Sequence, residues 1–121
     1  MVVLDTNVII DFLEGKERIV AAIKKYPSIE LATTFVNQYE LLKYAGRKGF
    51  EEALENLFVY NSSQPSSAAA ANAYRQLKAH GKTLSDNDLM VFGVCVANNE
   101  ILVTQDRGFE ALASDRIIVI K

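Results

Sequence analysis

Two acidic residues follow short apolar runs that are typical of buried strands. Asp5 comes directly after residues 1–4, and Asp106 comes two residues after the run at residues 101–104. Because the carboxyl ends of parallel strands meet at one edge of a sheet, we expect both carboxylates to lie at that edge. Each residue also has an ordinary interpretation, Asp5 as the cap of a following helix and Asp106 as a turn residue.

A third acid, Glu40, lies on a helix predicted over residues 34–46. It falls one turn after Val36, at the edge of the apolar stripe and not on the opposite face of the helix. A carboxylate in that position is partly desolvated and therefore favours a nearby cation. The alternative is a rim glutamate that reaches water or pairs with Lys43 or Arg47.

The fourth acid, Asp88, opens the most apolar helix predicted in the chain, over residues 85–98. Ser85 and Asp88 match the capping-box pattern, which explains an acid here without any chemistry. Asp86 lies in the same turn and competes with Asp88 for a role in a site. Asp88 directly precedes the buried stretch, so we favour it over Asp86.

A doubly wound sheet can bring these four acids together, and the four in combination indicate a functional site more strongly than any one of them. Carboxylates packed closely repel one another and do not all ionise unless cations are present. Mg²⁺ and Mn²⁺ prefer oxygen ligands, and sites of this kind act chiefly on phosphates. The pattern therefore predicts a divalent-metal site that handles phosphate.

The composition fits one small domain, residues 1–121, with 50% hydrophobic and 23% charged residues and a formal net charge of −2. Such a charge gives no broad basic surface for duplex DNA. With a single cysteine, Cys95, and a single histidine, His80, disulfide frameworks and sites with several Cys or His ligands are excluded. No apolar run approaches the roughly 20 residues of a membrane span, and no signal peptide is visible. We expect a cytoplasmic protein without membrane association.

Helical patterns and apolar β-branched runs alternate along the chain. Strands are predicted at residues 1–4, 29–32, 101–104 and 117–120, and helices at 8–13, 16–26, 34–46, 49–57, 67–80, 85–98 and 109–113, with a loop at 61–67. This alternation predicts an α/β fold in which helices cover both faces of a mainly parallel sheet.

With these residues in place, the chain resembles a PIN domain, and most closely the small VapC-type toxins of prokaryotic toxin–antitoxin pairs. Four segments carry the resemblance in the family's order and spacing: VVLDTNVIID at 2–11, TFVNQYEL at 34–41, SDNDLMV at 85–91 and TQDRGF at 104–109. Phe92 and Gly93 then stand where the family usually continues with small residues.

The resemblance implies a PIN-like three-layer α/β/α sandwich with a central, mainly parallel sheet, and a ribonuclease that uses Mg²⁺ or Mn²⁺. It assigns the catalytic and metal-binding roles to Asp5, Glu40, Asp88 and Asp106, with Asn7 and Thr104 supporting them through hydrogen bonds. Water as the nucleophile implies a 5′-phosphate product. The family also implies a homodimer and inhibition by a cognate antitoxin.

Contacts to RNA and to partners must come from local surfaces, because the net charge supplies no general attraction. The candidate RNA contacts are Lys43, Arg47, Lys48 and Arg107, of which the first three also suit a solvated helix end. The candidates for an interface with the inhibitor are Phe35, Tyr39, Tyr44, residues 68–71 and Tyr74, although Phe35 and the alanines also suit the core.

Two other functions stay open at this point. The chain could be a PIN-like module that binds RNA or protein without cutting, or another metal-dependent phosphoesterase or DNA nuclease. The presence of all four acids favours an enzyme, and only the resemblance favours RNA over DNA.

Overall fold

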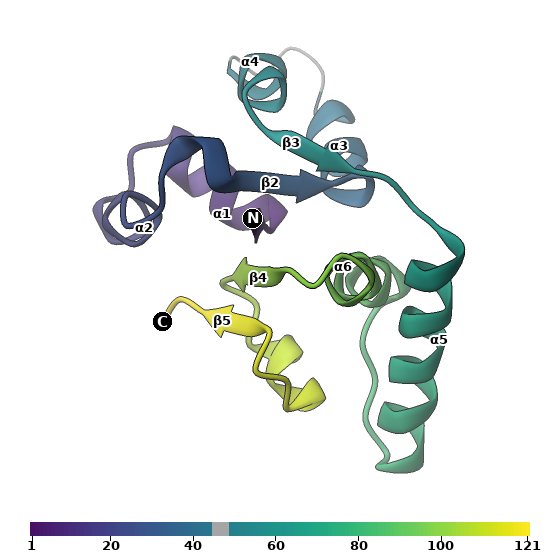
Figure 1. The fold of residues 1–121 in the computed structure, drawn as a ribbon. Coiled ribbons are helices and arrows are strands. Elements are labelled where there is room, and N and C mark those ends of the chain that lie inside the picture. The colour runs from purple at the N-terminus through teal and green to yellow at the C-terminus, as the bar shows by residue number, and fades with distance from the viewer. Residues whose placement is uncertain (45–48) are drawn as a thin grey trace.

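A computed structural model describes residues 1–44 and 49–121 (Figure 1). The elements in chain order are β1 (Val2–Leu4), α1 (Thr6–Leu13), α2 (Glu17–Ile23), η1 (Ser28–Glu30), β2 (Leu31–Thr34), α3 (Phe35–Leu42), α4 (Phe50–Glu55), β3 (Phe58–Tyr60), α5 (Gln64–Ala79), α6 (Asp86–Ala97), β4 (Ile101–Thr104), η2 (Arg107–Leu112) and β5 (Ile117–Val119), where η marks a 3₁₀ helix.

The strands form one five-stranded sheet in the order β3-β2-β1-β4-β5, and every neighbouring pair is parallel. In the register, Leu4 lies beside Val103, so β1 and β4 end at the same edge. The backbone N–H of Asp5 extends this pairing by donating to the carbonyl of Val103 at 3.0 Å. The predicted α/β class with a parallel sheet is confirmed.

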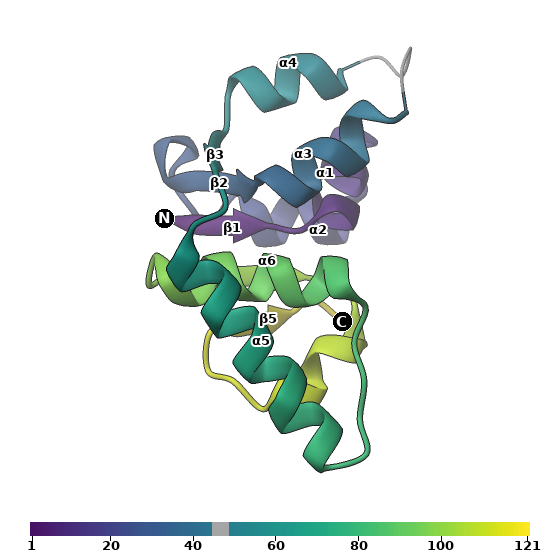
Figure 2. The ribbon, with the colours of Figure 1, turned by 90° about the vertical axis from the view of Figure 1, so that its right-hand side faces the viewer.

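Side chains that alternate along the strands build a separate core on each face of the sheet. Val3 and Leu102 pack under α5 and α6, whereas Leu4 and Val103 pack under α1 and α2. Figure 2 shows α5 and α6 in front of the sheet and α1 and α2 behind it. The predicted three-layer sandwich is therefore confirmed.

The boundaries of several elements differ from the sequence prediction. The strand β3 was missed, because Phe58–Tyr60 is too short to show an alternating pattern and lies at the edge of the sheet. The loop predicted to run to residue 67 ends at Ser63, whose hydroxyl accepts from the N–H of Ser66 and caps α5 at Gln64. The strand predicted at 29–32 begins two residues later, after a short 3₁₀ turn.

Helices α5 and α6 pack closely against each other at Gly93. A Cβ added at Gly93 would lie 2.3 Å from the carbonyl oxygen of Ser66 and 3.0 Å from the Cβ of Ala70. A glycine is needed here because any side chain would push the two helices apart. No helix among the described residues is long and apolar enough to cross a membrane.

Candidate active site

Asp5 is fixed at the carboxyl end of β1 by three hydrogen bonds. Its Oδ1 accepts from the backbone N–H of Thr6 and from Asn37 Nδ2, each at 3.0 Å, and its Oδ2 accepts from the hydroxyl of Thr104 at 2.6 Å. Only 7% of the residue is exposed. Burial raises the pKa of the Asp5 carboxyl, and the three hydrogen bonds oppose that shift. Asp5 is thus both the cap of α1 and a buried acid, which unites its two sequence interpretations.

Asn37 is a site residue that the sequence analysis missed. It is fully buried, and its side-chain oxygen accepts from the hydroxyl of Thr34 at 2.7 Å, as part of the capping box that begins α3. That contact turns the amide nitrogen toward Asp5 at 3.0 Å and toward the hydroxyl of Thr6 at 2.9 Å. The signal was available in the sequence, since Thr34 and Asn37 have capping-box spacing.

Glu40 lies one turn after Val36 on α3 and is half-buried, as its position on the wheel predicts. Its Oε1 accepts from the hydroxyl of Thr6 at 2.6 Å. Because Thr6 in turn accepts from Asn37, a chain of hydrogen bonds connects this carboxylate to the amide that holds Asp5.

Thr104 connects Asp5 to Asp106 on the other side of the site. The Thr104 hydroxyl donates to Asp5 and accepts from the backbone N–H of Asp106 at 3.0 Å. Asp106 is also the cap of η2, because its Oδ1 accepts from the N–H of Gly108 at 2.8 Å. Asp106 therefore has the turn role that its sequence suggests, at the edge of the sheet where a site was expected.

Asp88 and Asp86 both lie in the first turn of α6, but in different environments. Asp86 is exposed, whereas Asp88 is half-buried and lines the pocket described next. Burial, helped by the negative charges of Asp5, Asp106 and Glu40, raises the pKa of the Asp88 carboxyl to about 6, against the effect of the hydrogen bond with Ser85.

All four carboxylates line one pocket at the carboxyl edge of the sheet, which we call the acidic pocket. Its volume is about 130 Å³. Its lining consists of Asp5, Thr6, Asn7, Ile10, Glu40, Lys43, Tyr44, Asp88 and Asp106.

The four acids share this pocket but do not form a finished ligand set. Within the described residues, no group of three or more His, Cys, Asp or Glu side chains is arranged to hold a metal ion. Burial is the main cause of the raised pKa of Asp88, and the charges of Asp5, Asp106 and Glu40 add to it. Glu40 and Asp88 are only half-buried, so their side chains can turn toward a cation.

The other predicted site residues differ in how close they lie to the acidic pocket. Asn7 lines the acidic pocket, but in the described part of the chain its side chain donates to no carboxylate. Lys43 lines the pocket as well, with its ammonium 5.6 Å from the ring centre of Tyr39. Arg107 lies beside the pocket, at the start of η2. Arg47 and Lys48 lie outside the described residues.

The fold and the site define a class: a parallel α/β protein with an acidic pocket at the carboxyl edge of its sheet. The sequence profile of the PIN domain matches residues 2–115. The chain belongs to the PIN domain family. No curated protein sequence matches it significantly.

Several solved structures share this fold. A toxin–antitoxin complex from Klebsiella pneumoniae aligns with a TM-score of 0.83 at 18% identity, covering 100% of this chain and 98% of that one. FitAcB from Neisseria gonorrhoeae aligns with a TM-score of 0.82 at 22% identity, covering 100% and 97%. VapBC-1 from nontypeable Haemophilus influenzae aligns with a TM-score of 0.78 at 21% identity, covering 98% of each chain.

Proposed function

We propose that this chain is a divalent-metal-dependent endoribonuclease and the toxin of a toxin–antitoxin pair. The observation that supports the proposal most directly is the acidic pocket, in which four carboxylates from four separate elements gather at one edge of the sheet. The raised pKa of Asp88, to which the other three acids contribute, agrees with a surplus of negative charge in this pocket. The family supports a nuclease, and the four matching motifs favour the VapC-type toxins.

The donor set fits Mg²⁺ or Mn²⁺. All four candidate ligands present carboxylate oxygens, which these hard ions prefer over nitrogen or sulfur. Asp5, Glu40, Asp88 and Asp106 are therefore proposed to hold the metal, directly or through water. When bound, the ion would supply positive charge toward a phosphodiester and make a water more acidic.

The chain's own residues keep these acids oriented. Asp5 is held by donors on three sides, so its direction is set before any ligand arrives. The chain of hydrogen bonds from Asn37 through Thr6 fixes Glu40 relative to Asp5. Preorganisation of this kind reduces the reorganisation needed when charge develops in the reaction.

Binding of RNA is proposed to depend on cations at the rim of the acidic pocket. Lys43 lines the pocket among the acids and forms no ion pair with another described residue, so its charge is available to phosphate. Arg107 is exposed next to Asp106 and is also unpaired in the described part of the chain. These two residues remain the proposed RNA contacts, with Arg47 and Lys48 proposed on sequence alone.

An antitoxin partner is proposed because several similar structures are toxin–antitoxin complexes. Besides Tyr39, Tyr44 and Tyr74, which were predicted from the sequence and are exposed, we propose for it an apolar pocket of about 400 Å³ between α1, α2 and α4. Leu13 lines this pocket and is 40% exposed, and Ile29 beside it is 84% exposed. Such apolar exposure is typical of a surface that a partner covers.

A homodimer is proposed because the family resemblance implies one, and the aromatic residues predicted for an interface are exposed. Tyr39, Tyr44 and Tyr74 are 62%, 46% and 45% exposed, respectively. Of residues 68–71, Ala70 is buried in the core formed with α6, whereas Ala68 and Ala71 are exposed. Light scattering at micromolar protein concentration tests the dimer, and a monomer at that concentration would contradict it.

The decisive experiment uses the purified chain with labelled single-stranded RNA and with DNA of the same sequence, in Mg²⁺, Mn²⁺ or EDTA. We expect RNA to be cut only with metal, leaving a 5′-phosphate. Binding without cleavage would instead indicate a non-catalytic module, and cleavage of DNA alone would indicate a DNA nuclease.

A growth assay tests the toxin role. Expression of the chain alone should slow host growth, and Asp5→Asn or Glu40→Gln should relieve the effect because each removes one proposed ligand charge. Growth inhibition that persists undiminished in both variants would disconnect toxicity from the acidic pocket.

A further inference from the structure

A second polar pocket adjoins the acidic pocket. Its volume is about 400 Å³, within the range of small-molecule sites. It is lined by Asn7, Asp11, Gln105, Asp106 and Arg107, and it shares Asn7 and Asp106 with the acidic pocket. A strand whose scissile phosphate lay among the four acids would therefore extend into this pocket, which we call the side pocket.

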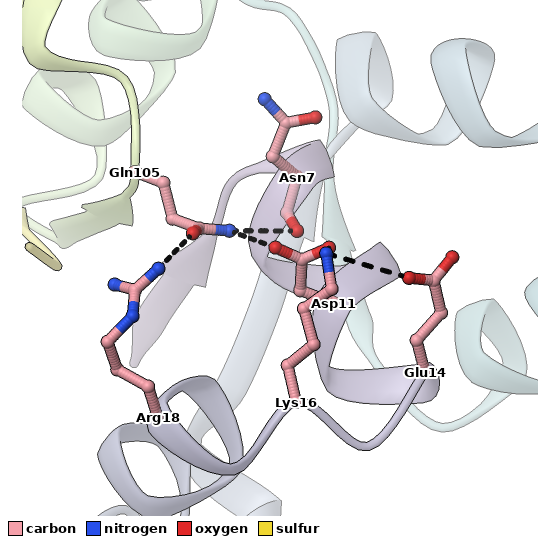
Figure 3. A network of polar contacts seen from close by, with 6 residues as sticks. All are labelled: Asn7, Asp11, Glu14, Lys16, Arg18 and Gln105. Atoms are coloured by element: carbon pink, nitrogen blue, oxygen red, sulfur yellow. Dashed lines mark hydrogen bonds and ion pairs between the residues drawn. The ribbon is translucent and has the colours of Figure 1, made fainter.

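Gln105 is the centre of a hydrogen-bond network beside this pocket (Figure 3). Its amide nitrogen donates to the carbonyl oxygen of Asn7 at 3.2 Å and to Asp11 Oδ2 at 2.8 Å. Its amide oxygen accepts from Arg18 Nη2 at 3.0 Å. Both ends of the amide are thus used, and the guanidinium of Arg18 is held by a residue that lines the side pocket.

Gln105, the hydrogen-bond partner of Arg18, is neutral, so it does not cancel the positive charge of the guanidinium. Within the described residues, Arg18 forms no ion pair within 4.0 Å, so its positive charge is oriented without being neutralised. A guanidinium has five N–H donors in a planar fork, and the bond to Gln105 leaves donors free. A fork of this shape matches the oxygens of a phosphate.

Asp11, the nearby acid, interacts with the charge of Arg18, but its two carboxylate oxygens already have other partners. Its Oδ2 accepts from Gln105, and its Oδ1 lies 3.0 Å from the ammonium of Lys16. The hydrogen bond from Gln105 and the charge of Lys16 keep the pKa of the Asp11 carboxyl below its usual value. The carboxylate therefore stays ionised and paired, which limits its repulsion of a phosphate.

We propose that Arg18, positioned by Gln105, binds the phosphate adjoining the scissile one in a single-stranded RNA that runs from the acidic pocket into the side pocket. The inference rests on the proposed nuclease function. It adds Arg18 as a phosphate contact. Arg18 lies 87 residues from Gln105 in sequence, and no sequence motif reveals their contact. Asn7, whose side-chain amide is exposed on both pockets, is available to contact the same nucleotide.

The test measures Arg18→Ala by steady-state cleavage of a short RNA in Mn²⁺ and by fluorescence anisotropy of the same labelled RNA in EDTA. We expect KM and Kd to rise roughly tenfold with kcat little changed, because a lost phosphate contact weakens ground-state and transition-state binding alike. The slope of log Kd against log salt should become shallower by about 0.7, the value for one phosphate on a single strand.

Two further variants separate phosphate binding from simple structural support. Arg75→Ala removes an exposed arginine on α5 and should change neither KM nor the salt slope. Gln105→Ala should raise KM by less than Arg18→Ala and should add little when Arg18 is already alanine, because it acts through that residue.

Each outcome decides between the two proposals. If the wild-type chain neither binds nor cuts RNA, the proposed function fails and this inference fails with it. If the wild-type cuts RNA but Arg18→Ala behaves like Arg75→Ala, only the inference fails. A fall in melting temperature and kcat at unchanged KM and salt slope would show that the network is structural, and would also overturn it.

Discussion

Two buried acidic sites in this molecule differ in how their negative charge is compensated. Glu100, directly before β4, accepts from the hydroxyl of Tyr60 at 2.5 Å and pairs with the α-ammonium of Met1 at 2.7 Å. In the acidic pocket, Asp5 is also buried, but all three of its donors are neutral. The first carboxylate has its cation within the fold, whereas the second has none among the described residues.

This difference separates a structural acid from one that awaits a ligand. Burial of a charge is costly unless the charge is paired, so an unpaired cluster needs a reason to persist. At Glu100 the ion pair and the hydroxyl compensate for burial, and Figure 1 shows the N-terminus between β2 and β4. Asp5 in the acidic pocket has no ion pair among the described residues, which agrees with the proposed metal.

The largest expected effect concerns Asp88 and its neighbour. Asp88→Asn should lower the RNA cleavage rate at least about a hundredfold, because it removes one of the four charges proposed to hold the metal. Asp86 is an exposed acid in the same turn and does not line the acidic pocket, so Asp86→Asn should leave the cleavage rate within a factor of about two. A dead Asp86→Asn with an active Asp88→Asn would reverse the assignment of the third acid.

The next effect is stabilisation by metal. Mn²⁺ at a hundred times its Kd should add about 2.7 kcal/mol to the free energy of unfolding by mass action, raising the melting temperature relative to EDTA. Asp5→Asn should show a smaller shift, because one buried ligand charge is lost.

Glu100→Gln is the matched control for the metal measurement. It changes an equally buried acid that already has a cation, so it should lower the melting temperature but retain the full Mn²⁺ shift. Loss of the shift in Glu100→Gln, or an unchanged shift in Asp5→Asn, would contradict the contrast between the two acids.

A smaller effect follows from the titration of Asp88 in EDTA. Its pKa in the folded protein, about 6, exceeds the reference value of 3.8. The carboxyl therefore stabilises the fold fully below about pH 4, and this contribution is lost as the pH rises through 6. The full shift corresponds to about 3 kcal/mol, and solvent screening at this half-buried side chain reduces it to about 1 kcal/mol.

Urea denaturation of Asp88→Asn at pH 4 and pH 8 measures this contribution. The variant should gain stability relative to wild-type at pH 8 and lose that advantage at pH 4. Asp86→Asn corrects for the helix dipole, because it lies in the same turn. An advantage of equal size at both pH values would show that burial and the neighbouring acids do not raise the pKa of Asp88 as proposed.

The sequence predicted the fold well where a segment was long or strongly patterned. The run at 101–104 was found because a strand buried on both faces of a parallel sheet is an unbroken apolar stretch. The apolar helix that follows Asp88 was found because it packs against both α5 and the sheet, which makes most of its surface apolar. The edge strand Phe58–Tyr60 was missed because three partly exposed residues carry no periodic signal. Its position depends on pairing with β2, which is a tertiary contact.

For the site, the sequence could supply acids but not their partners. Thr104 was expected to support the acids through the resemblance, and its hydroxyl does donate to Asp5. Asn37 was missed because its role requires α3 to leave β2 at an angle that aims the amide at Asp5. The contact between Arg18 and Gln105 was equally hidden, since 87 residues separate the two in sequence.

The smallest expected effect comes from the structural acid. Tyr60→Phe removes the hydroxyl that donates to Glu100 while the ion pair to the α-ammonium remains. Burial and the hydrogen bond to Glu100 raise the pKa of Tyr60 to about 12, so the hydroxyl is protonated and donating at every pH used for cleavage assays. Loss of a partly buried hydrogen bond to a charged group should cost about 1–2 kcal/mol of unfolding free energy, measured by urea denaturation.

RNA cleavage and the Mn²⁺ shift should stay unchanged in Tyr60→Phe, because Glu100 is paired and lies outside the acidic pocket. If Tyr60→Phe weakens the Mn²⁺ response as much as Asp5→Asn does, the two acids belong to one electrostatic system and the contrast drawn between them is wrong.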